Sequence, residues 1–192
     1  MHAVALIAGV AVIVVTSDLD RWQIGPLFVL AGFTTVSAVT QIATGNGKVY
    51  VSGVPIGLTT TIVLLGPGPA AILGALTMMV FWTRTRASWD TVLNNVSTYI
   101  WYPLVAGVFF HETVQLASLG PSTMPYYLMV FPTFVVALVV NFFGVVGYGC
   151  YVDRSSLAEA ARVAVLPIMS AELFSALLTM GAAYIAVEAG TA

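Results

Sequence analysis

The sequence predicts an all-α membrane protein, a polytopic bundle of about seven transmembrane helices. Of its 192 residues, 59% are hydrophobic and only 7% are charged, whereas soluble domains are about one-quarter charged. The uncharged runs are also long enough to cross a bilayer, because a helix rises about 1.5 Å per residue through a hydrocarbon core about 30 Å thick. We expect residues 1–192 to form a single integral membrane domain.

The first two spans are predicted from the earliest charges. Residues 1–17 form a short first span, which the charges within 18–21 end. Residues 22–44 form the second span, which ends before the turn signal Gly45-Asn46-Gly47. Lys48 then closes this part of the chain.

The next uncharged stretch, 49–83, would extend roughly 50 Å as one helix, which is too long for a single crossing. We therefore expect it to break at Gly66-Pro67-Gly68-Pro69, where two prolines remove backbone donors and two glycines permit a turn. The prediction is a hairpin of two short spans, 51–65 and 69–83, and these four residues are its structural positions.

Three further spans follow. A loop containing Arg84 and Arg86 leads to a span over 91–110, and a loop over 111–125 leads to a span over 126–151. A last charged loop precedes the seventh span, 163–187.

The positive charges predict the orientation of the bundle. Seven spans place five of the six basic residues on one side and leave Arg21 on the other; the five are Lys48, Arg84, Arg86, Arg154 and Arg162. Cytoplasmic loops carry the excess of basic residues in membrane proteins. We therefore expect a cytoplasmic N-terminus and an external C-terminus.

The charge and motif content excludes several classes of protein. Six basic and eight acidic residues do not make the basic surface of a nucleic-acid-binding protein. Cys150 is the only cysteine, so no internal disulfide forms, and no cysteine and histidine cluster has metal-ligand spacing. We expect no metal, no cofactor and no enzymatic activity, because the chain also lacks the common catalytic and phosphate-binding motifs.

Glu172 is the leading candidate for a ligand-binding residue. It lies near the middle of the last predicted span, where a carboxyl group is costly and usually faces protein or water. Ser175 and Thr179 follow it at helical spacing, so one stripe of this helix is polar. The alternative is a buried carboxyl that is hydrogen-bonded to a neighbouring helix for packing alone.

Asparagines supply the other candidates. Asn141 lies within the sixth span in line with Ala137 and Gly144, a smooth surface that suits close helix approach. Asn94 and Asn95 open the fifth span, where short polar side chains commonly cap free amides. We assign Asn141 and Asn95 to a tentative ligand site with Glu172, and Asn94 to a structural role; interhelical hydrogen bonding remains the alternative.

The order of several short motifs carries a resemblance: Val51-Ser52, the run Leu64 to Ala71, Leu93-Asn94-Asn95 and Val140-Asn141-Phe142. Between about Trp22 and Val187 the chain resembles the multi-span membrane input regions found N-terminal to HD-GYP phosphohydrolase or GGDEF diguanylate cyclase domains in bacterial signalling proteins. The resemblance implies that Gly66, Pro67, Asn94 and Asn141 recur for structural reasons, and it transfers no ligand.

The resemblance also implies a larger context. The family pattern continues with another membrane helix and a cytoplasmic output domain, so we expect this chain to be a fragment or a free-standing relative of a larger receptor, and homodimerisation is a further expectation. The leading interpretation is a non-enzymatic sensory or anchoring input domain of the cytoplasmic membrane. Its expected partners are the lipid bilayer and an unidentified small ligand.

Two alternatives remain open. One is a small-solute transporter subunit similar to the substrate-binding membrane component of energy-coupling-factor transporters, which are usually described with six spans and both termini inside. The other is a structural membrane scaffold.

Overall fold

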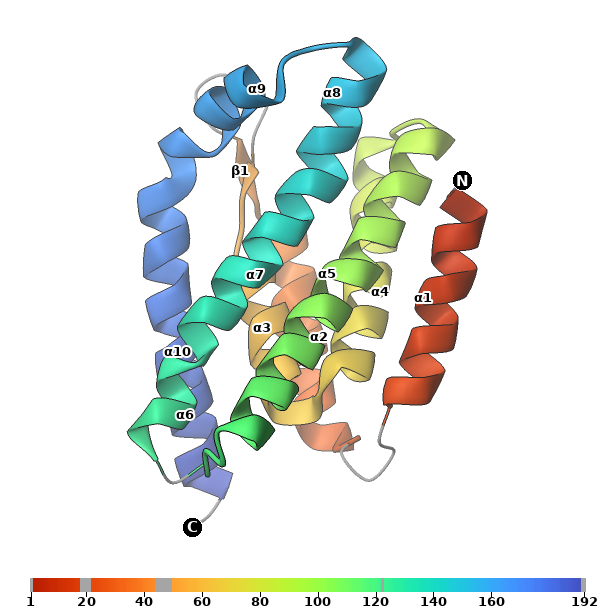
Figure 1. Ribbon diagram of the computed structural model, residues 1–192. Helices are drawn as coiled ribbons and strands as arrows, with labels where there is room; N and C mark the ends of the chain where they lie inside the picture. The colour runs from red at the N-terminus through yellow and green to blue at the C-terminus, as the bar shows by residue number, and fades with distance from the viewer. Residues whose placement is uncertain (1, 18–21, 44–49, 122, 191–192) are drawn as a thin grey trace.

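Figure 1 shows the computed structural model of the chain, which describes residues 2–17, 22–43, 50–121 and 123–190. The described part is helical except for one antiparallel pair of two-residue strands, β1 (Ile42–Ala43) and β2 (Tyr50–Val51). An all-α architecture is therefore confirmed. The helices are α1 (His2–Thr16), α2 (Ile24–Val39), α3 (Val54–Leu65), α4 (Pro67–Thr85), α5 (Trp89–Leu116), α6 (Met124–Leu128), α7 (Val130–Phe142), the π-helix η2 (Phe143–Gly147), α8 (Tyr148–Asp153), α9 (Leu157–Ala164), the 3-10 turn η3 (Leu166–Ile168) and α10 (Met169–Gly190).

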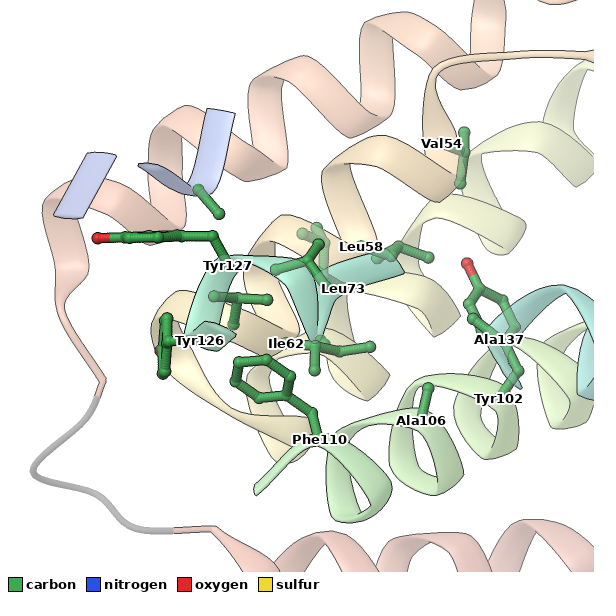
Figure 2. Close-up of a cluster of buried hydrophobic side chains, with 14 of the residues drawn as sticks. Val54, Leu58, Ile62, Leu73, Tyr102, Ala106, Phe110, Tyr126, Tyr127 and Ala137 are labelled. Atoms are coloured by element: carbon green, nitrogen blue, oxygen red, sulfur yellow. The ribbon is translucent and has the colours of Figure 1, made fainter. Parts of the chain in front are cut away.

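The short helix α3 lies at the centre of the bundle. It packs against α2, α4, α5, α7 and α10, and Leu58 and Ile62 on it are fully buried. Figure 2 shows Ile62 and Phe110 among the clustered apolar side chains that join α3 to α5 and to the α6–α7 segment. A central helix that is surrounded on all sides needs no polar face, which is why the sequence of α3 is apolar or threonine-rich throughout.

The predicted break between the third and fourth helices is present, and it is confined to one residue. Gly66 ends α3 and precedes α4 with φ +97° and ψ 177°, a conformation essentially restricted to glycine. Pro67 follows as the first residue of α4, where its missing N–H has no intrahelical acceptor to lose. Gly68 and Pro69 belong to the first turn of α4, so they are not part of the turn itself.

The predicted boundaries of the fifth helix are wrong at both ends. The helix begins at Trp89, where the Ser88 hydroxyl accepts a hydrogen bond from the Thr91 N–H and caps it. Asn94 and Asn95 therefore lie in the second turn and cap nothing. The helix also continues into the predicted loop as far as Leu116, because no glycine or proline lies between Gly107 and Gly120.

The predicted last span begins too early. Residues 157–164 form a separate helix, α9, and α10 begins only at Met169, after η3 with its Pro167. The sequence did contain a signal for α9: Ser156 and Glu159 have capping-box spacing, and the Ser156 hydroxyl accepts from the Glu159 N–H. The predicted turn Gly45-Asn46-Gly47 and the charges Arg21 and Lys48 lie outside the described residues.

The outer surface of the bundle is apolar. Two helical stretches, Met124–Asp153 and Leu157–Gly190, are long and apolar enough to cross a membrane, and only 22% and 18% of their most apolar windows are buried. Three shorter apolar helices, α1, α2 and α3, accompany them. Phe28 on α2 is 75% exposed and Ile185 on α10 is 67% exposed. Apolar surface of this extent indicates contact with another apolar phase.

Candidate functional site

The three side chains proposed for ligand binding lie around one cavity. Asn95, Asn141 and Glu172 come from α5, α7 and α10, and all three line a space of about 910 Å³. The first and the last of them, Asn95 and Glu172, are 77 positions apart in the sequence, so only the tertiary fold brings the three together. Most of the remaining lining is aliphatic or aromatic, as in typical small-molecule sites.

The cavity exists because α7 and α10 diverge. The two helical stretches meet near the C-terminal end of α10, where the rings of Tyr127 and Tyr184 pack edge to face at 5.1 Å. From there α7 and α8 slant away from α10, as Figure 1 shows, and α9 bridges the wide end between them. Residues of α4 and α5, including Met78 and Tyr99, line the inner side.

Glu172 is held in the first turn of α10, where it is 8% exposed. Ala176, Thr179 and Ala183 continue its buried stripe along α10 at helical spacing, so the side of α10 that carries Glu172 and Thr179 packs inward. The Glu172 carboxyl lies within electrostatic reach of the Tyr99 and Tyr102 hydroxyls. Its Oε2 is buried and accepts no hydrogen bond from the described residues.

Asn141 lies in the last turn of α7, immediately before the π-helix η2. Its Oδ1 is likewise buried and has no hydrogen-bond donor among the described residues. Among the described residues, the Asn141 oxygen therefore does not join two helices by a hydrogen bond, which was the packing alternative. A π-turn interrupts the regular ladder and often accompanies functional sites.

The adjacent residues Asn94 and Asn95 have different environments. The Asn94 side-chain amide donates to the Gly144 carbonyl oxygen at 2.9 Å and so joins α5 to η2. Asn95 points to the neighbouring cavity, where Tyr99, one turn further along α5, accompanies it. The structural role expected for Asn94 thus comes from a contact between helices, and helix capping does not contribute to it.

Several residues of the cavity were missed from the sequence. Ser52 directly follows β2, and Tyr99 is on α5. Helix α9 contributes Ala158, Ala161 and Arg162 to the lining. The signal that could have found α9 is its Ser156–Glu159 capping box; no local pattern marks the others.

The polar lining consists of amides, hydroxyls, one carboxyl and one guanidinium group, which suits hydrogen bonding to a ligand. Across the described residues no group of three His, Cys, Asp or Glu side chains could hold a metal ion. Comparison of the chain with protein-family models, with curated proteins and with solved structures finds no match.

Proposed function

We propose that this chain is a non-enzymatic, multi-pass input domain of the cytoplasmic membrane that senses a small ligand in the cavity between α7 and α10. The observation that carries the proposal is the convergence of Asn95, Asn141 and Glu172 on one cavity. Polar groups inside a membrane bundle are expensive and usually mark a ligand, an ion path or a proton path. Two of these groups also keep buried oxygens without donors among the described residues.

The apolar exterior and the arrangement of the ends support seven crossings. The N-terminal end of α1 and the C-terminal end of α10 lie at opposite ends of the bundle (Figure 1). An odd number of crossings requires this arrangement, whereas a six-span transporter subunit with both termini inside does not fit it.

Charge supports the orientation. The structure describes four of the five basic residues expected on the cytoplasmic side, namely Arg84, Arg86, Arg154 and Arg162. They lie at the C-terminal ends of α4, α8 and α9, and these ends share one end of the bundle in Figure 1. The α9 end is therefore assigned to the cytoplasm.

The proposed mechanism is a shift in helix packing. A ligand that contacts Glu172 on α10 and Asn141 on α7 favours whichever spacing of these helices suits it, and so changes the population of conformations. Because α9 lies between α8 and α10 in the chain, at the cytoplasmic end, a change in the spacing of α7 and α10 moves α9. No side chain in this mechanism undergoes a chemical reaction.

Thermal unfolding tests ligand binding directly. Purified protein is heated in detergent with an organic-solvent extract of bacterial membranes and, separately, with an aqueous cell extract. We expect one extract to raise the unfolding midpoint of the wild type and to leave the Glu172→Leu variant unchanged, because a ligand stabilises only the state that binds it. If neither extract moves the wild-type midpoint, the scaffold alternative replaces this proposal.

A further inference from the structure

We propose that the cavity between α7 and α10 binds a single-chain amphiphile with a primary amine head group, which reaches it sideways from the bilayer. This inference rests on the proposed function and specifies the ligand of the same site. Its head group is assigned from the buried polar atoms of the cavity, and its chain from the apolar residues at the rim.

The buried polar atoms call for a hydrogen-bond donor. Asn141 Oδ1 and Glu172 Oε2 are both acceptors, both buried, and both without a donor among the described residues. A buried acceptor that is left unpaired costs free energy that a donating ligand recovers. A primary amine carries two or three N–H donors on one atom, so it can donate to more than one acceptor.

The ionisable residues that line the cavity also favour a head group that donates hydrogen bonds. Glu172 and Arg162 are the charged residues that line the cavity. Glu172 is 8% exposed, whereas Arg162 is exposed on α9 at the end of the cavity. The buried ionisable group is therefore the acid, and a cationic or hydrogen-bond-donating head group complements it. An anionic head group would meet the Glu172 carboxyl instead.

The rim shows where an apolar chain would lie. Val135 and Val139 on α7 and Leu173 on α10 line the cavity, and each is 40% to 49% exposed on the outer surface of the bundle. These residues flank the opening between the diverging helices, which faces the lipid in the proposed topology. The alkyl chain of a ligand can therefore leave the cavity between α7 and α10 without crossing a polar surface.

The experiment uses a fluorescent reporter at the rim. The full chain carries Cys150→Ser and Leu173→Cys, is labelled with bimane, and is placed in nanodiscs of a choline lipid. A matched reporter uses Phe174→Cys, because Phe174 is the next residue of α10, is 61% exposed and does not line the cavity. The probes are dodecylamine, dodecyltrimethylammonium, which keeps the charge but has no N–H donor, and dodecanoate.

We expect dodecylamine to change the fluorescence at the Leu173→Cys position saturably and to leave the Phe174→Cys reporter unchanged. Dodecyltrimethylammonium and dodecanoate should require at least about tenfold more probe, since a hydrogen bond to a charged group contributes about that factor. Glu172→Gln should weaken dodecylamine binding about tenfold. Glu188→Gln, the same change at the far end of α10, should not alter it.

Three results overturn the inference. Equal responses to dodecylamine and dodecyltrimethylammonium would show that donors are irrelevant, and an unchanged affinity in Glu172→Gln would remove the carboxyl from the site. Disulfide-linked dimers formed through Leu173→Cys in an unlabelled sample, with no probe effect on the labelled protein, would show that a second copy fills the opening. If dodecylamine fails while a cell extract still stabilises only the wild type, the sensory proposal stands without this ligand class.

Discussion

The side-chain amide of Asn94 donates a hydrogen bond of 2.9 Å to the carbonyl oxygen of Gly144, fifty residues further along the chain. The bond joins the second turn of α5 to the π-helix η2, where the regular backbone ladder is interrupted. Gly144 also permits the contact sterically, because a Cβ there would lie 2.5 Å from the Thr98 side chain. Asn141, one turn earlier, is positioned at the cavity by this junction.

Replacing Asn94 with leucine should therefore destabilise the protein. The substitution leaves the Gly144 carbonyl oxygen without this donor, and we expect the free energy of unfolding to fall by about 1–3 kcal/mol. Thermal unfolding in detergent measures the change. Asn95→Leu is the control, since the Asn95 side chain lines the cavity; a loss of stability in Asn95→Leu that equals the loss in Asn94→Leu would contradict the assignment.

A second prediction concerns the closest helix pair. A Cβ added to Gly74 on α4 would collide with the Tyr99 carbonyl oxygen of α5, which is backbone and cannot rotate away. We expect Gly74→Ala to lower stability by about 1–3 kcal/mol through overpacking, seen as a lower unfolding midpoint. Gly181→Ala on α10, with no atom within 4 Å of its added Cβ, should be neutral or stabilising by about 0.5–1 kcal/mol. Similar midpoints for both variants would refute this packing.

The turn at Gly66 leads to a third prediction. Its φ of +97° with ψ of 177° is a region where any side chain is strained, so Gly66→Ala and Gly66→Asn should each cost about 1–3 kcal/mol. Asparagine offers no rescue, because at positive φ it tolerates only the left-handed helical region, which has a different ψ. Gly149→Ala, at a helical glycine in open space, is the matched control. Full stability of Gly66→Asn, measured by the unfolding midpoint, would rule out this backbone conformation.

The sequence was sufficient to predict most of the helices and the position of their main break, but not α9. Long uncharged runs and the Gly66-Pro67 signal are local features, and the all-α architecture and the hairpin follow from them. The end of α5 was misjudged because His111 and Glu112 were treated as loop residues. A helix can project past the apolar region, however, and α5 ends only at Leu116, shortly before Ser118, whose φ is positive.

The candidate site could be predicted only in part. Glu172, Asn141 and Asn95 stand out because polar residues are rare in apolar helices, so their chemistry is visible locally. Their shared cavity depends on the divergence of α7 from α10 and on η2, which arise from contacts such as Asn94–Gly144 between distant segments. Tyr99 could not be distinguished in advance, because aromatic residues in membrane proteins are common at many positions.

The attachment of α1 gives a fourth prediction. The Trp101 indole N–H donates to the Ala5 carbonyl oxygen at 3.0 Å and so joins α5 to α1. Trp101→Phe keeps an aromatic ring but removes the donor, and we expect faster hydrogen exchange across residues 2–16 with little change in α3. Trp89→Phe, at a tryptophan that is 65% exposed, should leave α1 exchange unchanged. Exchange that rises equally in α1 and α3 would indicate general destabilisation instead.

The proposed orientation gives the last prediction, which single cysteines can test in intact cells. Ser155 lies exposed between α8 and α9, and Ala117 lies exposed just beyond α5 at the other end of the bundle. In a Cys150→Ser background, a membrane-impermeant maleimide should label Ala117→Cys from outside and should label Ser155→Cys only after the cells are opened.

The two sites separate orientation from the number of crossings. The continuous helical stretch Met124–Asp153 lies between Ala117 and Ser155 in the chain. Labelling of these two sites from opposite sides therefore requires that this stretch crosses the membrane. The reverse pattern would keep this crossing but invert the bundle, against the basic residues at the ends of α4, α8 and α9. Labelling of both sites from outside would contradict a crossing by this stretch, and with it the membrane-facing opening between α7 and α10.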